Sequence, residues 1–471
     1  MAYPSAGKPF SETLLHGGEE EGTAAPAPAH AHAHANAHAH AHAPAPPACA
    51  PRADRLPSLD GLRGVLSVFI VTGHVLTFFV AFDVADPHPS PLVGRVGLEY
   101  LTPVSLFVLL SGFSLCLPFL PPREGGGDAG EAGGAPPPPL FPTGASRLRF
   151  VCKRWARLAA MYYVSLALAV PLLLYSDLAT VIISAVTTPV MVQAVVLSGN
   201  GWNGPLWTVS ALMACYTVFP LLIRPMRGLG ARGLRLTAAG CYLASVAIAV
   251  AWLALSPASA LALHILGPLR LPQFVVGMAA ALLTRAAPPA RPAVWVGVAS
   301  AVLAADVLGC LATVAAVAAS DGASAGFNVQ QGWAYFAEWV SLPAVAALVM
   351  GLSAPVGSAG PIQAVLGSRP AVALGRVSYA AYCIHFPLLL LGGMAVKGGF
   401  GPGALPVVWG FAWAPYPAWS TPLLVAAVFV VSAGAHHGVE VPLTRVLVRG
   451  VERLGWGGGE GGGAAGDKVP A

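Results

Sequence analysis

Residues 60–82, DGLRGVLSVFIVTGHVLTFFVAF, indicate what kind of fold this chain adopts. The stretch is long enough to cross a membrane as a helix, because about 20 apolar residues span the hydrocarbon core. Three ionisable residues interrupt it, namely Asp60, Arg63 and His74. Such residues are costly in lipid and are expected to face the interior of a helix bundle. The stretch therefore predicts a multi-pass membrane protein with a polar interior.

The composition of the whole chain agrees with a membrane bundle. Of its 471 residues, 56 % are hydrophobic and only 10 % are charged, whereas soluble proteins have about 25 % charged residues. So few charges cannot cover a soluble surface, which argues against a cytosolic enzyme, a nucleic-acid-binding protein or a disordered regulator. We therefore expect the lipid bilayer, and no nucleic acid, as a partner. The seven cysteines form no C-x-x-C pair, so neither a disulfide framework nor a metal centre is predicted.

Ten segments are apolar and long enough to span the membrane. The fold class we predict is all-α, a multi-pass membrane helix bundle with about ten transmembrane helices. An eleventh apolar segment, 179–198, is ambiguous. The ten segments lie near 62–83, 98–120, 156–176, 205–223, 236–255, 263–284, 293–318, 335–353, 374–396 and 420–442.

The basic residues decide between the two topologies, because Lys and Arg concentrate in cytoplasmic loops. With ten spans and the N-terminus inside, the outer loops hold only Arg95 and Lys397. If 179–198 also crossed, every later loop would change sides and this bias would disappear. We therefore predict that 179–198 lies on the outer face, or re-enters from it, and that both termini are cytoplasmic. The inner loops would then carry Arg123, Arg147, Arg149, Lys153, Arg154, Arg224, Arg227, Arg232, Arg235, Arg285, Arg291, Arg369, Arg445, Arg449 and Arg453.

The chain is predicted to have one membrane domain, 55–446, containing a disordered loop at 121–146. Residues 1–54 are a His/Ala/Pro-rich tail and 447–471 a Gly-rich tail, both predicted to be disordered because they have too few apolar residues to form a core. The first tail has six histidines at alternating positions between 30 and 42. These could bind zinc or nickel loosely, or they could be a repeat expansion without a role. No signal peptide is recognised at the polar start of the chain.

Arg63 and His74 are expected to lie on one face of the first span. His74 comes eleven positions after Arg63, which brings the helix back to within about 20° of the same face, about 16 Å along its axis. His74 would therefore lie near the middle of the bilayer and Arg63 near its cytosolic edge. The position alone leaves two roles open for His74, an interhelical hydrogen-bond partner or a catalytic group.

A pair of arginines opens the third span. Arg154 and Arg157 are three residues apart and so share one face of a helix. Guanidinium groups bind phosphate well, so the pair could clamp a phosphate-bearing ligand at the cytosolic surface. The alternative is that these residues only determine the topology.

The ninth span contains a second histidine at a similar depth. In LGRVSYAAYCIHFPLLL (374–390), Ser378, Tyr382 and His385 recur at helical spacing. Two histidines at one depth favour a shared polar cavity. Arg270 and Gln273 interrupt the sixth span in the same way.

Glu440, near the cytosolic end of the tenth span, needs a partner, because buried charges are seldom left unpaired. Arg63, Arg270 and Arg376 are the candidates, and the sequence does not choose among them.

Together these residues resemble the acyltransferase-3 family of integral membrane acyltransferases. The resemblance covers about 55–446 and consists of short motifs in the family's order. They are RLPSLDGLRG (55–64) followed by His74, SLFVLLSGF (105–113), the Arg154–Arg157 pair, PLWTVS (205–210) with FP (219–220), LGRVSYAAYCIHFPL (374–388) and VEVP (439–442).

This resemblance implies a fold and a chemistry. Members transfer an acyl group, often acetyl, from acyl-CoA such as acetyl-CoA to a hydroxyl of a carbohydrate or lipid. By analogy His74 would be the general base, with Arg63 orienting its surroundings or neutralising the diphosphate of the donor. Arg154 and Arg157 would hold the CoA phosphates. An acyl-histidine intermediate is an open alternative.

The acceptor would lie on the outer side of His74. Trp207 and Ser210 fall in the outer half of the fourth span, and Tyr382 and His385 would line the same cavity. These four residues are the predicted substrate-binding set.

The sequence departs from the family pattern at two positions. Ser105 stands where the family usually has Asp, and Leu212 where it usually has Glu. Both changes remove a carboxylate, which keeps a catalytically inactive relative in consideration. A multi-pass transporter is the other alternative, although no internal repeat is visible and the Arg63–His74 spacing is not explained by transport.

Overall fold

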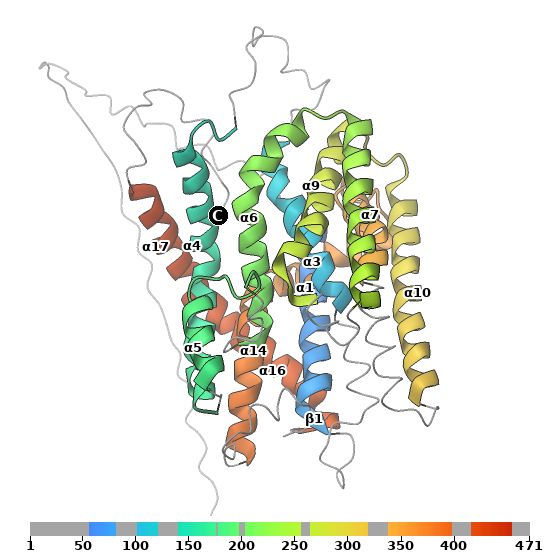
Figure 1. Ribbon diagram of the computed structural model, residues 1–471. Helices are drawn as coiled ribbons and strands as arrows, with labels where there is room; N and C mark the ends of the chain where they lie inside the picture. The colour runs from blue at the N-terminus through green and yellow to red at the C-terminus, as the bar shows by residue number, and fades with distance from the viewer. Residues whose placement is uncertain are drawn as a thin grey trace, which may run out of the picture. The chain divides into compact units, whose positions relative to one another are not determined.

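The computed structural model describes residues 56–81, 101–120, 140–175, 178–196, 203–255, 264–318, 338–397 and 416–454. Its contacts divide the chain into two units, Met1–Ala53 and Asp54–Ala471, and every described residue belongs to the second (Figure 1). The predicted N-terminal tail with its histidine tract, loop residues 121–139 and tail residues 455–471 lie outside the described residues. Residues 144–146 and 447–453, predicted to be disordered, are instead helical, in Gly144–Ala169 and Val441–Arg453.

The described residues are almost entirely helical, so the predicted all-α class is confirmed. One parallel β pair, β1 (Val80–Ala81) with β2 (Tyr416–Pro417), is the only strand pairing within them. The α-helices are α1 (Pro57–His74), α3 (Leu101–Cys116), α4 (Gly144–Ala169), α5 (Leu178–Thr187), α6 (Trp207–Arg227), α7 (Ala231–Leu255), α9 (Leu271–Ala286), α10 (Pro292–Ala318), α12 (Leu342–Leu352), α13 (Pro361–Leu366), α14 (Arg369–Lys397), α16 (Thr421–Ala435) and α17 (Val441–Arg453).

Shorter helical turns extend several of these helices. Two are π-helical, η1 (Val75–Phe79) directly after His74 and η9 (His436–Glu440) between α16 and α17. The others are 3₁₀ turns: η3 (Leu117–Phe119), η4 (Val170–Tyr175), η5 (Gly204–Leu206), η7 (Gly267–Arg270) and η8 (Ala418–Ser420).

Six helical segments within the described residues are long and apolar enough to cross a membrane, so the predicted count of about ten is not confirmed. They are 144–173, 204–227, 231–255, 292–309, 369–396 and 421–453. The four other expected spans coincide with α1, α3, α9 and α12, which have 18, 16, 16 and 11 helical residues. Helical turns adjoin three of these helices: η1 follows α1, η3 follows α3 and η7 precedes α9.

The ambiguous segment 179–198 forms α5, which has only 10 residues. A helix of that length covers about 15 Å, half of the hydrocarbon core. The chain then turns, and the Ala194 carbonyl accepts a hydrogen bond from the backbone N–H of Gly267 at 2.7 Å. This geometry agrees with the prediction that the segment does not cross. The side on which it lies stays a prediction.

Helices α7, α10 and α16 expose apolar side chains on the surface of the bundle. Leu243 on α7, Val298 and Leu308 on α10, and Val430 on α16 are each more than half exposed. Such faces suit contact with lipid chains, and together with the six apolar segments they indicate an integral membrane protein.

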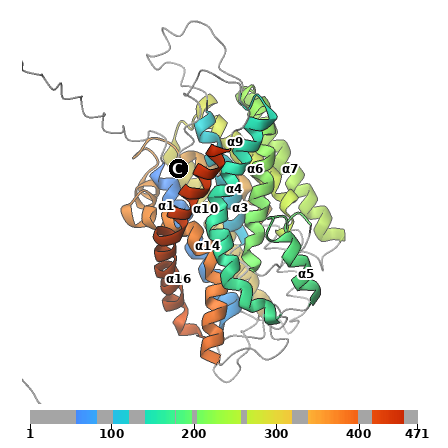
Figure 2. The same ribbon diagram turned by 90° about the vertical axis from the view of Figure 1, so that its left-hand side faces the viewer.

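Two helix pairs form the centre of the bundle, α1 with α14 and α3 with α9. Glycines let their backbones approach. A Cβ on Gly64 would lie 2.7 Å from the Gly375 nitrogen, and one on Gly277 would collide with the Leu109 carbonyl. Helix α4 packs against α14 and α17, and α16 covers another side of α14 (Figure 2).

Candidate active site

The α1–α14 crossing determines which side chains meet further along the two helices. Gly64 and Gly375 are in contact, and the two helices run in the same direction from that point. His74 lies ten residues beyond Gly64, and His385 lies ten residues beyond Gly375. At about 1.5 Å per residue, both histidines are about 15 Å from the crossing. The two rings therefore arrive at the same level.

His74 and His385 form a direct hydrogen bond. His385 Nε2 lies 2.8 Å from His74 Nδ1. The ring centroids are 4.9 Å apart and the ring planes differ by 17°. The two centroids are further apart than the two bonded nitrogens by about the sum of the two ring radii. The nitrogens therefore lie on the line between the centroids, and the rings meet edge to edge nearly in one plane. Both are buried, with 8 % of His74 and none of His385 exposed.

The backbone of α14 fixes the tautomers of this pair. His385 Nδ1 lies 2.8 Å from the Tyr382 carbonyl and 3.1 Å from the Ala381 carbonyl. Carbonyl oxygens only accept hydrogen bonds, so His385 Nδ1 carries the hydrogen and Nε2 of the neutral ring is an acceptor. His74 Nδ1 must then donate to His385. In a neutral His74 this leaves Nε2 as the basic nitrogen.

Aromatic rings pack around the pair. Phe386 meets His74 edge-on at 6.1 Å between centroids, and Phe79 meets Phe386 at 5.4 Å. Phe79 closes the π-helix that begins directly after His74. The histidine pair is therefore a polar contact inside an apolar shell, where a hydrogen bond is stronger than in water.

Three arginines gather towards the other end of α1. Arg63 donates to Asp60 Oδ1 at 2.7 Å and to Ser114 Oγ at 2.6 Å. The phenol of Tyr216 on α6 interacts electrostatically with both Arg63 and Arg154, although these come from helices α1 and α4.

Arg154 and Arg157 also lie close enough to repel each other. The Arg154 guanidinium carbon lies 5.4 Å from the centroid of the Phe150 ring. The sequence predicted the arginine pair, and the structure adds Arg63 to its surroundings. Two positive charges around the Tyr216 hydroxyl, with a third beside Arg154, favour an anionic ligand.

Two of the predicted substrate-binding residues use their hydroxyl groups within the protein. Ser210 Oγ accepts from the Ala194 backbone N–H at 3.1 Å. Tyr382 donates to the Pro205 carbonyl at 2.6 Å and accepts from Thr208 Oγ1 at 2.6 Å.

Trp207 packs in a cluster with Ile70, one turn before His74, and with Tyr382. The structure thus brings Trp207, Tyr382 and His385 into the neighbourhood of His74. Their contact with an acceptor stays a prediction.

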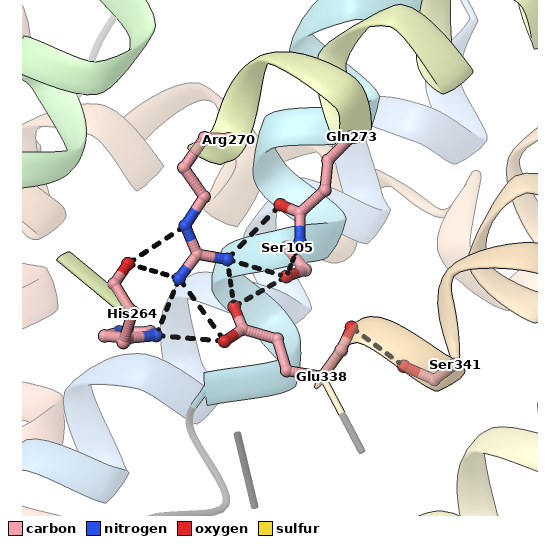
Figure 3. Close-up of polar contacts among 6 residues, drawn as sticks. All are labelled: Ser105, His264, Arg270, Gln273, Glu338 and Ser341. Atoms are coloured by element: carbon pink, nitrogen blue, oxygen red, sulfur yellow. Dashed lines mark hydrogen bonds and ion pairs between the residues drawn. The ribbon is translucent and has the colours of Figure 1, made fainter. Parts of the chain in front are cut away.

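A second buried polar cluster joins residues that the sequence analysis named separately, Ser105, Arg270 and Gln273, to two that it missed, His264 and Glu338 (Figure 3). It joins Ser105 of α3, His264, Arg270, Gln273 of α9 and Glu338, all of them buried. Glu338 lies inside the apolar segment 335–353 and His264 inside 263–284, so a charge in a predicted span was the signal available. In the part of the chain that the structure describes, no three His, Cys, Asp or Glu side chains gather as metal ligands would.

Glu440 pairs with His436, a residue that was not among the three arginine candidates. Glu440 Oε2 lies 2.8 Å from His436 Nδ1, one helical turn away. Arg63 pairs instead with Asp60, and Arg270 with Glu338. On the next helix, Glu452 of α17 pairs with Lys153 of α4 at 3.2 Å.

Comparisons with known proteins point to one family. Residues 56–435 match the model Acyl_transf_3, which is described as an acyltransferase domain. The chain is also similar to a protein named acyltransferase MdmB from Streptomyces mycarofaciens. The two are 26 % identical over 435 residues, which cover 85 % of this chain and 94 % of that relative. No solved structure matches the chain.

Proposed function

Since the chain belongs to the acyltransferase-3 family and is a membrane acyltransferase, we propose a donor, an acceptor and a base for its reaction. An acyl group, acetyl in the simplest case, passes from acyl-CoA to a hydroxyl of a carbohydrate or lipid-like acceptor. His74 is the general base. The observation that carries this proposal is the His74–His385 hydrogen bond of 2.8 Å, whose polarity leaves His74 Nε2 basic.

The chemistry balances with His74 as the proton carrier. The acceptor oxygen attacks the thioester carbon while His74 Nε2 takes its proton, and the carbon–sulfur bond then breaks. The proton passes from His74 to the departing sulfur, which leaves as the free thiol of CoA. General-base help of this kind contributes about 10²–10⁴ in rate. During proton transfer, His385 Nε2 continues to accept from His74 Nδ1 and so stabilises the imidazolium.

The arginines are the proposed binding site for the donor phosphates. Arg63 and Arg154 lie around Tyr216 and Arg157 lies beside Arg154, and guanidinium groups form strong charge-assisted bonds to phosphate. Arg63 and His74 are about 16 Å apart along α1. The pantetheine arm of CoA has a comparable reach, so phosphates held at the arginines would bring the thioester to His74.

The first test is the loss of the base. In H74A we expect acyl transfer from radiolabelled acetyl-CoA into the lipid and carbohydrate fractions of membranes to fall at least about 10²-fold. Membrane insertion, measured by the amount of monodisperse protein extracted in detergent, should be unchanged. Full transfer by H74A would refute the mechanism. Wild-type membranes that leave the thioester intact would favour a transporter or an inactive relative.

A second variant tests the donor site separately. R154A should raise the KM for acetyl-CoA at least about tenfold with a smaller effect on kcat, because a hydrogen bond to a charged group is worth about 1.5–3 kcal/mol. R453A is the matched control, since Arg453 lies on the exposed side of α17 and outside the arginine group. An unchanged KM in R154A would mean that the pair serves topology alone.

A further inference from the structure

We propose that Glu338 is a positioning residue for the acceptor end of the site, acting through His264 and Arg270 on Trp207. The inference rests on the proposed function, because it takes Trp207 to lie beside the acceptor. It assigns a role to the buried cluster of Figure 3, which the reaction as described does not use.

One oxygen of Glu338 neutralises Arg270. Arg270 NH1 lies 2.6 Å from Glu338 Oε1, and neither side chain is exposed. Ser105 Oγ donates to the same oxygen at 2.6 Å. A buried ion pair is tolerated only when its remaining hydrogen-bonding groups are satisfied.

Arg270 satisfies this condition. It donates through NH1 to Gln273 at 3.3 Å and through Nε to the His264 carbonyl at 3.0 Å. Its NH2 group also donates to that carbonyl. The guanidinium group is therefore held in one orientation.

The other oxygen of Glu338 orients His264. Glu338 Oε2 lies 3.0 Å from His264 Nδ1. Arg270 NH2 is also near this nitrogen, at 2.8 Å. The two hydrogens of NH2 have acceptors in the His264 carbonyl and in Glu338 Oε2. A carboxylate only accepts hydrogen bonds, so His264 Nδ1 donates to Glu338 Oε2, and Glu338 fixes both the tautomer and the tilt of the ring.

Both groups held by Glu338 contact Trp207. The His264 ring meets the Trp207 ring edge-on with centroids 4.8 Å apart. The Arg270 guanidinium carbon lies 5.4 Å from the Trp207 centroid and 5.1 Å from that of Trp339. Cation–π contacts of this kind strengthen when desolvated. The orientation of Trp207 therefore depends on Glu338 from two directions.

Trp207 connects this cluster to the histidine pair. It belongs to the same buried cluster as Ile70, which precedes His74 by four residues on α1. His264 also lies within electrostatic reach of His74. A displacement of Trp207 would therefore change the surface next to His74 without touching the donor arginines on α1 and α4.

Two variants distinguish positioning of His264 by Glu338 from simple neutralisation of the Arg270 charge. E338Q leaves Arg270 buried without its counter-charge, so we expect a lower melting temperature in detergent and at least tenfold less transfer from radiolabelled acetyl-CoA. In S105D/E338S a carboxylate replaces the Ser105 hydroxyl, which lies 3.2 Å from Arg270 NH1, and Oε2 beside His264 is lost. The melting temperature should recover to within a few degrees of wild type. Transfer should stay at least tenfold low, with the KM for acetyl-CoA unchanged.

A third variant, H264N, tests the positioning role of Glu338 if S105D/E338S does not fold. H264N keeps a donor towards Glu338 but removes the ring that contacts Trp207. We expect a small change in melting temperature and at least fivefold less transfer. Transfer within twofold of wild type in S105D/E338S or H264N would overturn the role of Glu338. H74A, measured alongside, keeps the two proposals apart. If H74A is inactive and H264N is fully active, only the inference about Glu338 fails.

Discussion

At the scale of single residues, the structure shows contacts of His385 that the sequence did not reveal. The ninth-span pattern predicted a residue that lines the acceptor cavity. In the structure, both ring nitrogens of His385 already have partners: Nδ1 donates to carbonyls of its own helix, and Nε2 accepts from His74. In the proposed reaction, a histidine held in this way orients the base, much as a third group orients the base in other acid–base sites.

Substitutions of His385 test this dependence. H385F retains a ring but accepts no hydrogen bond, so His74 loses control of its tautomer, and we expect kcat to fall about 10²-fold, the lower end of general-base contributions. H385Q offers an amide oxygen near the position of Nε2 and should lose less. Both kcat values are measured with acetyl-CoA on protein matched for melting temperature. Equal kcat in H385F and wild type would show that His74 works without His385.

At the scale of elements, the meeting of the two histidines depends on close helix packing. The backbones of α1 and α14 touch at Gly64 and Gly375, where a Cβ on Gly375 would collide with the Asp60 carbonyl. Small residues allow such an approach in membrane bundles. The crossing point sets the register of the two helices, and the register brings His74 level with His385.

An alanine at this crossing should disturb the site from a distance. In G375A we expect a loss of about 1–3 kcal/mol in stability, as for other overpacked positions, and a lower kcat because the two histidines separate. G434A on α16 is the matched control, since a Cβ there meets nothing within 4 Å. Alanine is a better helix former than glycine by about 1 kcal/mol, so the control should be neutral or more stable. Melting temperature and kcat of both variants provide the check, and identical behaviour would contradict the role of the crossing.

The residues that the sequence could and could not predict differ in a physical way. The sequence singled out His74, His385 and the arginine pair because each is polar at a defined depth along one helix, which periodicity reveals. The carboxylate partner of Arg270 was not found, because Glu338 comes from a segment 68 residues away. Periodicity shows which face of a helix a residue lies on, but it does not show which other helix packs against that face.

At the scale of the whole molecule, the donor arginines and the basic loops are predicted to share one side of the membrane. Figure 1 shows the start of α4 and the α6–α7 connection at the same end of the helices. Arg147 and Arg149 lie in the first turns of α4, and Arg232 in that of α7. Because basic loops are retained in the cytoplasm, this end is the expected entry side for acyl-CoA, which carries several negative charges and does not cross a bilayer unaided.

Sidedness of the reaction tests this orientation. We expect radiolabelled acetyl-CoA added outside to be consumed by inside-out membrane vesicles that contain the protein and not by sealed right-side-out vesicles. Permeabilising the right-side-out vesicles should restore the activity to the inside-out level, which controls for the amount of enzyme. H74A vesicles of both orientations give the background. Equal transfer by sealed right-side-out vesicles would place the arginine end outside. The assignment of both termini to the cytoplasm would then also be wrong, because the sides of the arginine end and of the two termini are all inferred from the same distribution of Lys and Arg along the chain.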